Sequence, residues 1–88
     1  MTRVEVDLLT NQGNGAVLRL PERQFPGVLV QGDTLNAFIC LLGVAAKALG
    51  RRDFTETEEV IRGFMGDLEE LRARYEDALK KHGIGLPY

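Results

Sequence analysis

The sequence has very few of the side chains from which metal and disulfide sites are built. It contains one cysteine, one histidine and no tryptophan among 88 residues. A single cysteine excludes an internal disulfide bond, and one cysteine with one histidine is too few for the usual zinc sites. We therefore expect no bound metal.

The chain also lacks a large charge of either sign. Eleven basic and thirteen acidic side chains leave a formal net charge of -2. Proteins that bind nucleic acid usually carry a strongly basic surface for the phosphates. The short basic pairs Arg51-Arg52 and Lys80-Lys81 are offset by acids around them, so nucleic acid is not an expected partner.

No apolar run is long and continuous enough to predict a membrane span. The longest run, from Leu35 to Leu49, is interrupted by Asn36, Gly43 and Lys47. As a helix it would reach only about 22 Å at 1.5 Å per residue, which is less than the apolar core of a bilayer. The N-terminal residues carry acids and do not resemble a signal peptide. With no membrane span and a free thiol, we expect a cytoplasmic protein.

Residues with catalytic chemistry are scattered, and each has a simpler structural role. His82 stands among basic residues at the predicted end of a helix, where a cation suits the helix dipole. Cys40 lies between apolar neighbours and is expected to behave as a small hydrophobe. The segment Gly13-Asn14-Gly15 lacks the lysine and serine of a phosphate loop and is expected to form a turn. We expect no catalytic residue and no cofactor, and we predict that the protein is not an enzyme.

The first third of the chain has the pattern of three β-strands. Residues 3–10 alternate between apolar and charged side chains, which is typical of a half-buried strand. Residues 16–20 and 25–31 are the next two strands. The links between them are short and rich in turn-forming residues, which favours an antiparallel meander over residues 3–31.

Two helices are predicted for the rest of the chain. The first covers residues 34–49, with Asp33 or Thr34 as its N-terminal cap and Gly50 after its end. The second covers residues 55–82; it begins at a capping box that starts with Thr55 and is followed by Gly83. The sequence therefore predicts a single α+β domain over residues 1–88, a three-stranded antiparallel meander followed by two helices (β-β-β-α-α), with the last helix long and amphipathic.

The helix over residues 34–49 has almost no polar face. Twelve of the fifteen residues from Leu35 to Leu49 are apolar, and such a helix needs cover on all sides. We expect the sheet and the second helix to cover two sides and a second copy of the chain to cover the third, giving a homodimer. A tight monomer with small alanines facing solvent is the alternative. The residues expected to mediate self-association are Phe38, Ile39, Leu42, Ile61, Phe64 and Leu68.

One segment resembles a known family. Residues 25–35 read Phe-Pro-Gly-Val-Leu-Val-Gln-Gly-Asp-Thr-Leu. This resembles the N-terminal core of HicB-like antitoxins, in which a strand that begins with Pro-Gly leads into Gln-Gly-Asp-Thr-Leu and a helix. The resemblance covers roughly residues 3–49, and small bacterial proteins of unknown function share the same core. The chain departs from the HicB pattern at Asn36-Ala37, where that family has two acids, and in its long last helix.

The resemblance implies a non-catalytic protein-binding module, antitoxin-like or immunity-like, that masks a protein partner such as a toxin. We expect partner contacts at Glu22, Arg23 and Gln24, beside the third strand, and on the outer face of the second helix. The alternative is a self-associating structural or interaction protein, which the apolar first helix favours. A small-molecule binding protein is a third class, and the sequence offers no polar constellation for it.

Overall fold

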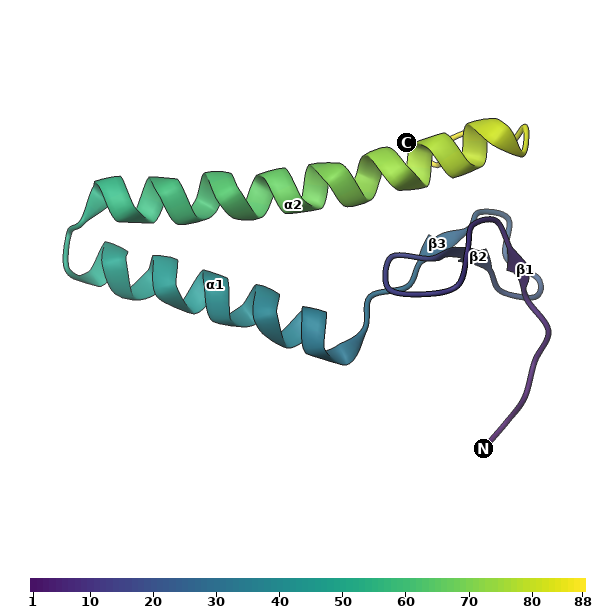
Figure 1. Ribbon diagram of the computed structural model, residues 1–88, viewed down its shortest axis with the longest axis horizontal. Helices are drawn as coiled ribbons and strands as arrows, with labels where there is room; N and C mark the ends of the chain where they lie inside the picture. Colours follow the sequence, from purple (N-terminus) through teal and green to yellow (C-terminus); the bar gives the residue numbers. More distant parts are fainter. The chain divides into compact units, whose positions relative to one another are not determined.

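The computed structural model describes residues 1–88 and confirms the α+β class, with three strands followed by two helices (Figure 1). The elements are β1 (Asp7–Leu8), β2 (Val17–Arg19), β3 (Gly27–Val28), α1 (Gly32–Gly50) and α2 (Phe54–Lys81), the last of which has 28 residues. The chain divides into two compact units. The sheet unit contains residues 1–30 and 71–88, and the helical unit contains residues 31–70, so that α2 contributes to both.

The three strands form one antiparallel sheet in the order β1-β2-β3, as the predicted meander requires. They are shorter than predicted, and the register of β1 on β2 explains where β1 begins. Asp7 faces Arg19, so two residues further along the same register Glu5 would face Pro21. Proline has no N–H to donate, and it cannot continue the ladder. The prediction of a strand from residue 3 is therefore wrong for residues 3–6, which are exposed.

A glycine with a left-handed backbone shapes the side of β2 that pairs with β3. Gly15 has φ of 82°. Its N–H donates to the carbonyl of Leu29 at 2.9 Å, and the N–H of Leu29 donates to the carbonyl of Ala16 at 2.8 Å. Gly15 and Ala16 on one strand thus oppose the single residue Leu29 on the other. This is the arrangement of a β-bulge whose first residue is glycine. The turn before it is closed by a 3.2 Å bond from the Ala16 N–H to the carbonyl of Gly13.

The sheet unit has a small apolar core that α2 completes. Val17 of β2 packs with Tyr75, Ala78 and Leu79 of α2, and Leu79 and Val17 are fully buried. Leu9 and Ile84 pack against this cluster. Full burial of a side chain such as Leu79 contributes about 1.5–3 kcal/mol. The expected contacts were between the sheet and the first helix, whereas the C-terminal part of the second helix supplies those of this core.

The C-terminal end of α2 is capped as predicted. Gly83 has φ of 67°, and its N–H donates to the carbonyl of Lys80 at 3.2 Å. The N–H of Ile84 donates to the carbonyl of Leu79 at 2.9 Å. These two bonds define a Schellman motif, in which the apolar residue after the glycine packs back on the last turn. The motif places Ile84 against the core of the sheet unit.

The predicted caps between the two helices are wrong by two residues. Helix α1 ends in a Schellman motif with Arg52, at φ of 60°, in the left-handed position. The N–H of Asp53 donates to the carbonyl of Ala48 at 2.9 Å, and Gly50 lies within the last turn. Asp53 also caps α2, because its Oδ1 accepts a 3.1 Å bond from the N–H of Glu56. Because the N–H of Asp53 closes α1 and its carboxylate opens α2, no cap is needed at Thr55.

The start of α1 also differs from its prediction. Gln31 is the N-terminal cap, and it makes no side-chain bond of the capping type. Asp33 lies inside the first turn, where its carboxylate suits the helix dipole. Its Oδ1 accepts a 2.8 Å bond from the N–H of Thr34.

Candidate protein-binding surfaces

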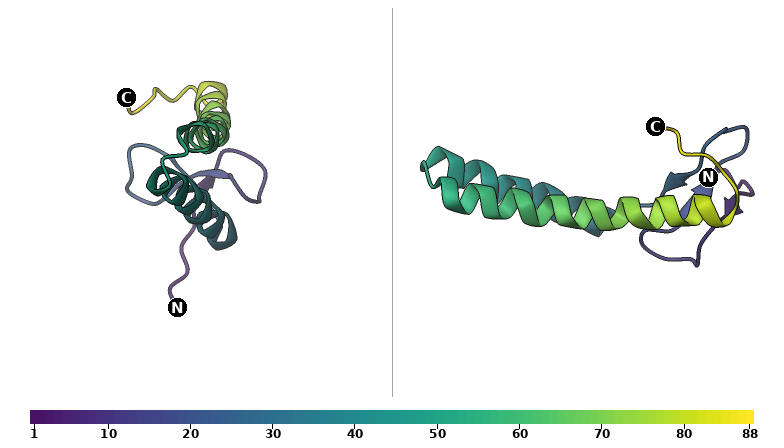
Figure 2. Two further views of the ribbon diagram at one scale, coloured as in Figure 1. Left: turned by 90° about the vertical axis from the view of Figure 1, so that its left-hand side faces the viewer. Right: turned by 90° about the horizontal axis from the view of Figure 1, so that it is seen from above.

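The helical unit is a hairpin in which α1 and the first half of α2 lie side by side and antiparallel (Figures 1 and 2). Phe38 and Phe64 meet between the two helices, with ring centroids 5.1 Å apart in an edge-to-face arrangement. Ala45 and Ala48 are buried, whereas Leu41 is partly buried. Phe38, Leu41, Ala45 and Ala48 are three or four residues apart, so they lie on one side of α1, and this side faces α2.

This packing divides the residues that the sequence analysis assigned to self-association. Phe38 and Phe64 contact each other within the hairpin. Ile39 and Leu42 on α1 are 61% and 49% exposed, and they lie on a different side of the helix. Ile61 and Leu68 of α2 are also exposed. Four of the six predicted residues thus lie on the outside of the hairpin and two lie inside it.

The exposed apolar residues form a stripe on each helix, and on α2 the exposed Glu58 interrupts it between Phe54 and Ile61. Along each helix, every residue is rotated by about 100° from the one before it. On α1 the stripe is rotated by about 100°, in this same sense, from the side that faces α2, and on α2 it is rotated by a similar angle from the side that faces α1. Because the two helices run in opposite directions, these two rotations bring both stripes to the same side of the hairpin. We call this surface the apolar helical face; it consists of Leu35, Ile39, Leu42, Ala46, Leu49, Phe54, Ile61, Met65 and Leu68.

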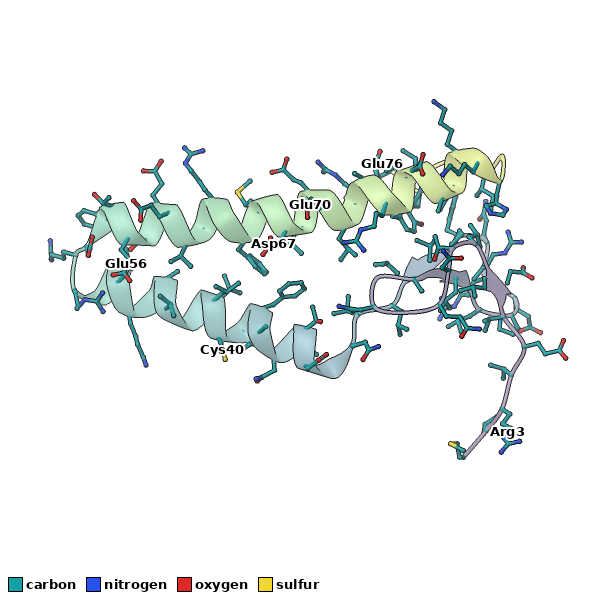
Figure 3. The ribbon with its side chains drawn as sticks, viewed as in Figure 1. Arg3, Cys40, Glu56, Asp67, Glu70 and Glu76 are labelled. Atoms are coloured by element: carbon teal, nitrogen blue, oxygen red, sulfur yellow. The ribbon has the colours of Figure 1, made fainter.

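The opposite side of the hairpin has a different composition. Its one exposed large apolar residue is Val44, which is 44% exposed. Gly63 and Asp67 of α2 lie on that side by helical rotation. Cys40 is exposed and points away from α2 (Figure 3). The apolar surface of the helical unit is therefore concentrated on one side.

A second apolar surface lies in the sheet unit, around the connection from β2 to β3. A groove of about 450 Å³ is lined by Leu18, Leu20, Arg23, Phe25, Pro26, Gly27, Val28 and Leu29. We call it the β3 groove. Leu20, Phe25 and Leu29 are 49%, 38% and 44% exposed. Of the predicted partner contacts, Arg23 lines this groove, while Glu22 and Gln24 are its exposed neighbours in the same connection.

The connection beside the β3 groove contains a strained residue. Glu22 has φ of 65°, a backbone region that costs residues with a Cβ about 1–2 kcal/mol. A 3.2 Å bond from the Arg23 N–H to the carbonyl of Leu20 closes the turn around it. Glycine is the usual residue at such a turn position. The side chain of Arg23 makes no ion pair with any acid of the chain.

A cavity of about 620 Å³, lined by both polar and apolar groups, lies between the β1–β2 connection and the end of α2. Lys81 at its edge is paired with Asp77 at 2.9 Å. Arg74 also lines this cavity, and its Nη1 is only 3.0 Å from where a Cβ on Gly15 would lie. This cavity brings together no set of groups suited to acid–base or nucleophilic catalysis.

The other ion pairs within α2 also join residues four apart. Glu58 pairs with Arg62 at 2.8 Å. Glu76 lies 3.6 Å from Arg72. All of these pairs are exposed, and such pairs contribute only about 0.3–0.5 kcal/mol each.

His82 and Tyr75 serve the fold. The Nε2 of His82 lies 3.1 Å from the carbonyl oxygen of Leu9 and ties the end of α2 to the β1–β2 connection. The hydroxyl of Tyr75 donates to the carbonyl of Pro26 at 2.7 Å, and burial raises the pKa of this phenol. No group of three or more histidine, cysteine, aspartate or glutamate side chains is placed to hold a metal ion.

A family model for a family of unknown function, DUF6959, matches residues 1–88. The chain belongs to the DUF6959 family. No curated protein and no solved structure matches it. The family description assigns no activity.

Helix α1 of this DUF6959 chain is long and apolar enough, by length and composition alone, to cross a membrane. The apolar run from Leu35 to Leu49 is shorter than the helix, which has 19 residues and spans about 28 Å at 1.5 Å per residue. Core helices of proteins that never enter a membrane pass the same test, but they are mostly buried, whereas only 11% of this stretch of α1 is buried. Most residues of the chain are exposed, and nothing else in the structure indicates a membrane.

Proposed function

We propose that this DUF6959 protein is a non-catalytic protein-binding module that masks a protein partner, in the manner of an antitoxin or an immunity protein. The partner binds at the β3 groove. The observation that carries the proposal is the combination at this groove of exposed apolar side chains with Arg23, a cation without an acidic partner in the chain.

The groove has the composition of the centre of a protein interface. Leu20, Phe25 and Leu29 provide apolar area that is well exposed in the free chain, and covering such area drives association. Arginine is enriched at interfaces because its planar guanidinium can hold a carboxylate with two hydrogen bonds. The expected partner surface therefore presents one or two apolar side chains with an aspartate or glutamate beside them.

The strained turn supports a role for this connection beyond folding. A glutamate in the left-handed region persists only when the surrounding structure holds it there, and such residues concentrate at functional sites. Glycine at position 22 would remove the strain. The side chain of Glu22 therefore serves something other than stability, and contact with a partner at the adjacent groove would account for it.

The resemblance of residues 25–35 to the HicB-like core agrees with this location, because that segment begins in the groove and continues into α1. The masking would be steric. A protein seated on the β3 groove would cover the edge strand β3 and the connection that precedes it. We propose a cytoplasmic location for this interaction.

The test is co-purification from the native host with the full-length chain as bait. We expect one protein in a 1:1 ratio with the wild-type chain and a loss of about tenfold or more in its recovery with Arg23→Glu, because reversing this charge would repel the partner's acid. Arg3→Glu is the matched control, because it makes the same charge change at a residue that does not line the groove. Arg3 lies on the N-terminal segment and is labelled in Figure 3.

Two results would refute the proposal. One is that no stoichiometric partner is recovered with the wild-type chain. The other is that Arg23→Glu retains the partner as well as Arg3→Glu does. If a partner is recovered, the gene beside that of the bait is the first place to look for it, because antitoxin-like and immunity-like proteins act on products made together with them.

A further inference from the structure

We infer that the apolar helical face is covered by a second copy of this chain, so that two helical hairpins form a four-helix bundle. This surface is separate from the β3 groove. The inference therefore does not depend on the proposed function, and either one could fail without the other.

The spacing of the exposed residues on α1 is that of a helix–helix seam. Leu35, Ile39, Leu42, Ala46 and Leu49 follow one another at intervals of four, three, four and three. This is the heptad repeat by which side chains of one helix insert between those of another. On α2, Ile61, Met65 and Leu68 continue the same pattern with intervals of four and three.

Helix α1 therefore carries two seams, side by side. Phe38 and Ala45 belong to the seam that α2 already occupies, and Leu42 belongs to the seam that is open. A helix in a hairpin needs only one seam, whereas a helix in a four-helix bundle contacts two neighbours. The second seam is what the bundle requires and what the isolated hairpin does not use.

The exposed area matches that of a stable interface. The eight large side chains of the apolar helical face are between 39% and 61% exposed. At roughly 200 Å² for a large apolar side chain, they leave about 800 Å² uncovered. That exceeds the largest apolar patch of a typical monomer, about 300–600 Å². It equals the area of about 800 Å² that each partner contributes to a standard interface.

The charges around the face favour an identical partner. None of the nine residues of the face is charged. The one charged side chain within the α2 stripe, Glu58, is paired with Arg62 at 2.8 Å. In a twofold dimer each patch meets its own copy. A face with a net charge would repel its copy, and a charged heterologous partner would find no complementary charge here. A face whose apolar residues are neutral and whose one acid is paired suits a second copy.

The experiment measures the mass of the full-length chain by light scattering and sedimentation at micromolar concentration. We expect twice the monomer mass of 9.8 kDa for the wild type. Leu42→Glu should raise the dimer dissociation constant by about 100-fold or more, because a buried, unpaired charge is costly at the centre of an interface. Val44→Glu is the matched control, with similar exposure on the same helix but on the opposite side.

A second variant and a vesicle-binding experiment distinguish the dimer from its alternatives. Met65→Glu tests the α2 half of the same face, and the helical circular dichroism of each variant shows whether the chain is folded. The inference is overturned if the wild type is a monomer, or if folded Leu42→Glu and Met65→Glu dimerise as Val44→Glu does. Flotation of the wild-type monomer with vesicles of phosphatidylcholine and phosphatidylglycerol would also overturn it, because a lipid surface would then be what covers the face.

Discussion

The hydroxyl of Tyr75 on α2 donates a 2.7 Å hydrogen bond to the main-chain carbonyl of Pro26, 49 residues earlier in the chain. Tyr75 is buried, and its ring belongs to the core that Val17 and Leu79 share. Pro26 is also buried and lines the β3 groove. The bond therefore fixes the entry to β3 against the helix and holds one wall of the groove in place.

Removing this hydroxyl should destabilise the protein. Tyr75→Phe keeps the ring in the core but leaves the carbonyl of Pro26 without its partner, which costs about 1–3 kcal/mol. The free energy of unfolding from a urea titration measures the effect. Tyr88→Phe is the matched control, because Tyr88 is 69% exposed, and it should change that free energy by less than about 0.5 kcal/mol.

The same phenol makes stability depend on alkaline pH. Burial raises the pKa of Tyr75 in the folded chain above the ordinary value of 10.0. The unfolded chain therefore loses this proton first as the pH rises, and the stability due to the neutral phenol is fully present below pH 10.0 and falls above it. Stability of the wild type should decline more steeply there than that of Tyr75→Phe. Equal slopes for the two proteins would contradict the assignment.

The elements of this fold follow from local signals, whereas their contacts do not. Gly83 ends α2 as the sequence indicates, because a left-handed cap followed by an apolar residue is a local motif. The side of α1 that faces α2 could not be predicted in the same way. A side through Leu35, Phe38 and Leu42 and one through Phe38, Leu41 and Ala45 have the same spacing of three and four, and only the tertiary contact with Phe64 selects between them.

The length of the first strand shows a similar limit. Alternation of apolar and charged residues over 3–10 fits a strand well, but a strand also needs a partner with N–H groups to donate. Whether Pro21 faces this segment depends on the register, which the turn over 11–15 sets. Only part of the β3 groove could be predicted from the sequence. Arg23 could be placed beside the third strand, whereas the apolar residues around it come together only through the folding of the connection.

Gly15 should not tolerate a side chain. Its φ of 82° is unfavourable for other residues, and an added Cβ would lie 3.0 Å from Arg74 Nη1. Gly15→Ala should lower the free energy of unfolding by about 1–2 kcal/mol. Gly27→Ala is the control, because Gly27 has open space around it and no positive φ. Both are compared by thermal and urea unfolding, and equal effects would show that the bulge is not required.

Gly66 presents the opposite case. It lies within α2, no atom comes within 4 Å of its missing Cβ, and by helical rotation it points away from the apolar helical face. Gly66→Ala should therefore stabilise the chain by about 1 kcal/mol, the difference between the two residues inside a helix. Dimer mass should be unchanged. A loss of stability would mean that another backbone approaches α2 at this glycine.

Glu22 gives the sharpest test of whether the turn beside the β3 groove is shaped for function. Glu22→Gly relieves a strain of about 1–2 kcal/mol and adds about 0.5–1 kcal/mol of chain entropy to the unfolded state, so the folded protein should gain about 0.5–1 kcal/mol. Gln24→Gly is the control. Gln24 lies in the same connection but has no positive φ, so this variant relieves no strain, and the added chain entropy should lower its stability. In the co-purification experiment, Glu22→Gly should recover less of the partner than the wild type while being the more stable protein. A variant that is both more stable and equally able to hold the partner would leave Glu22 without a role at this surface.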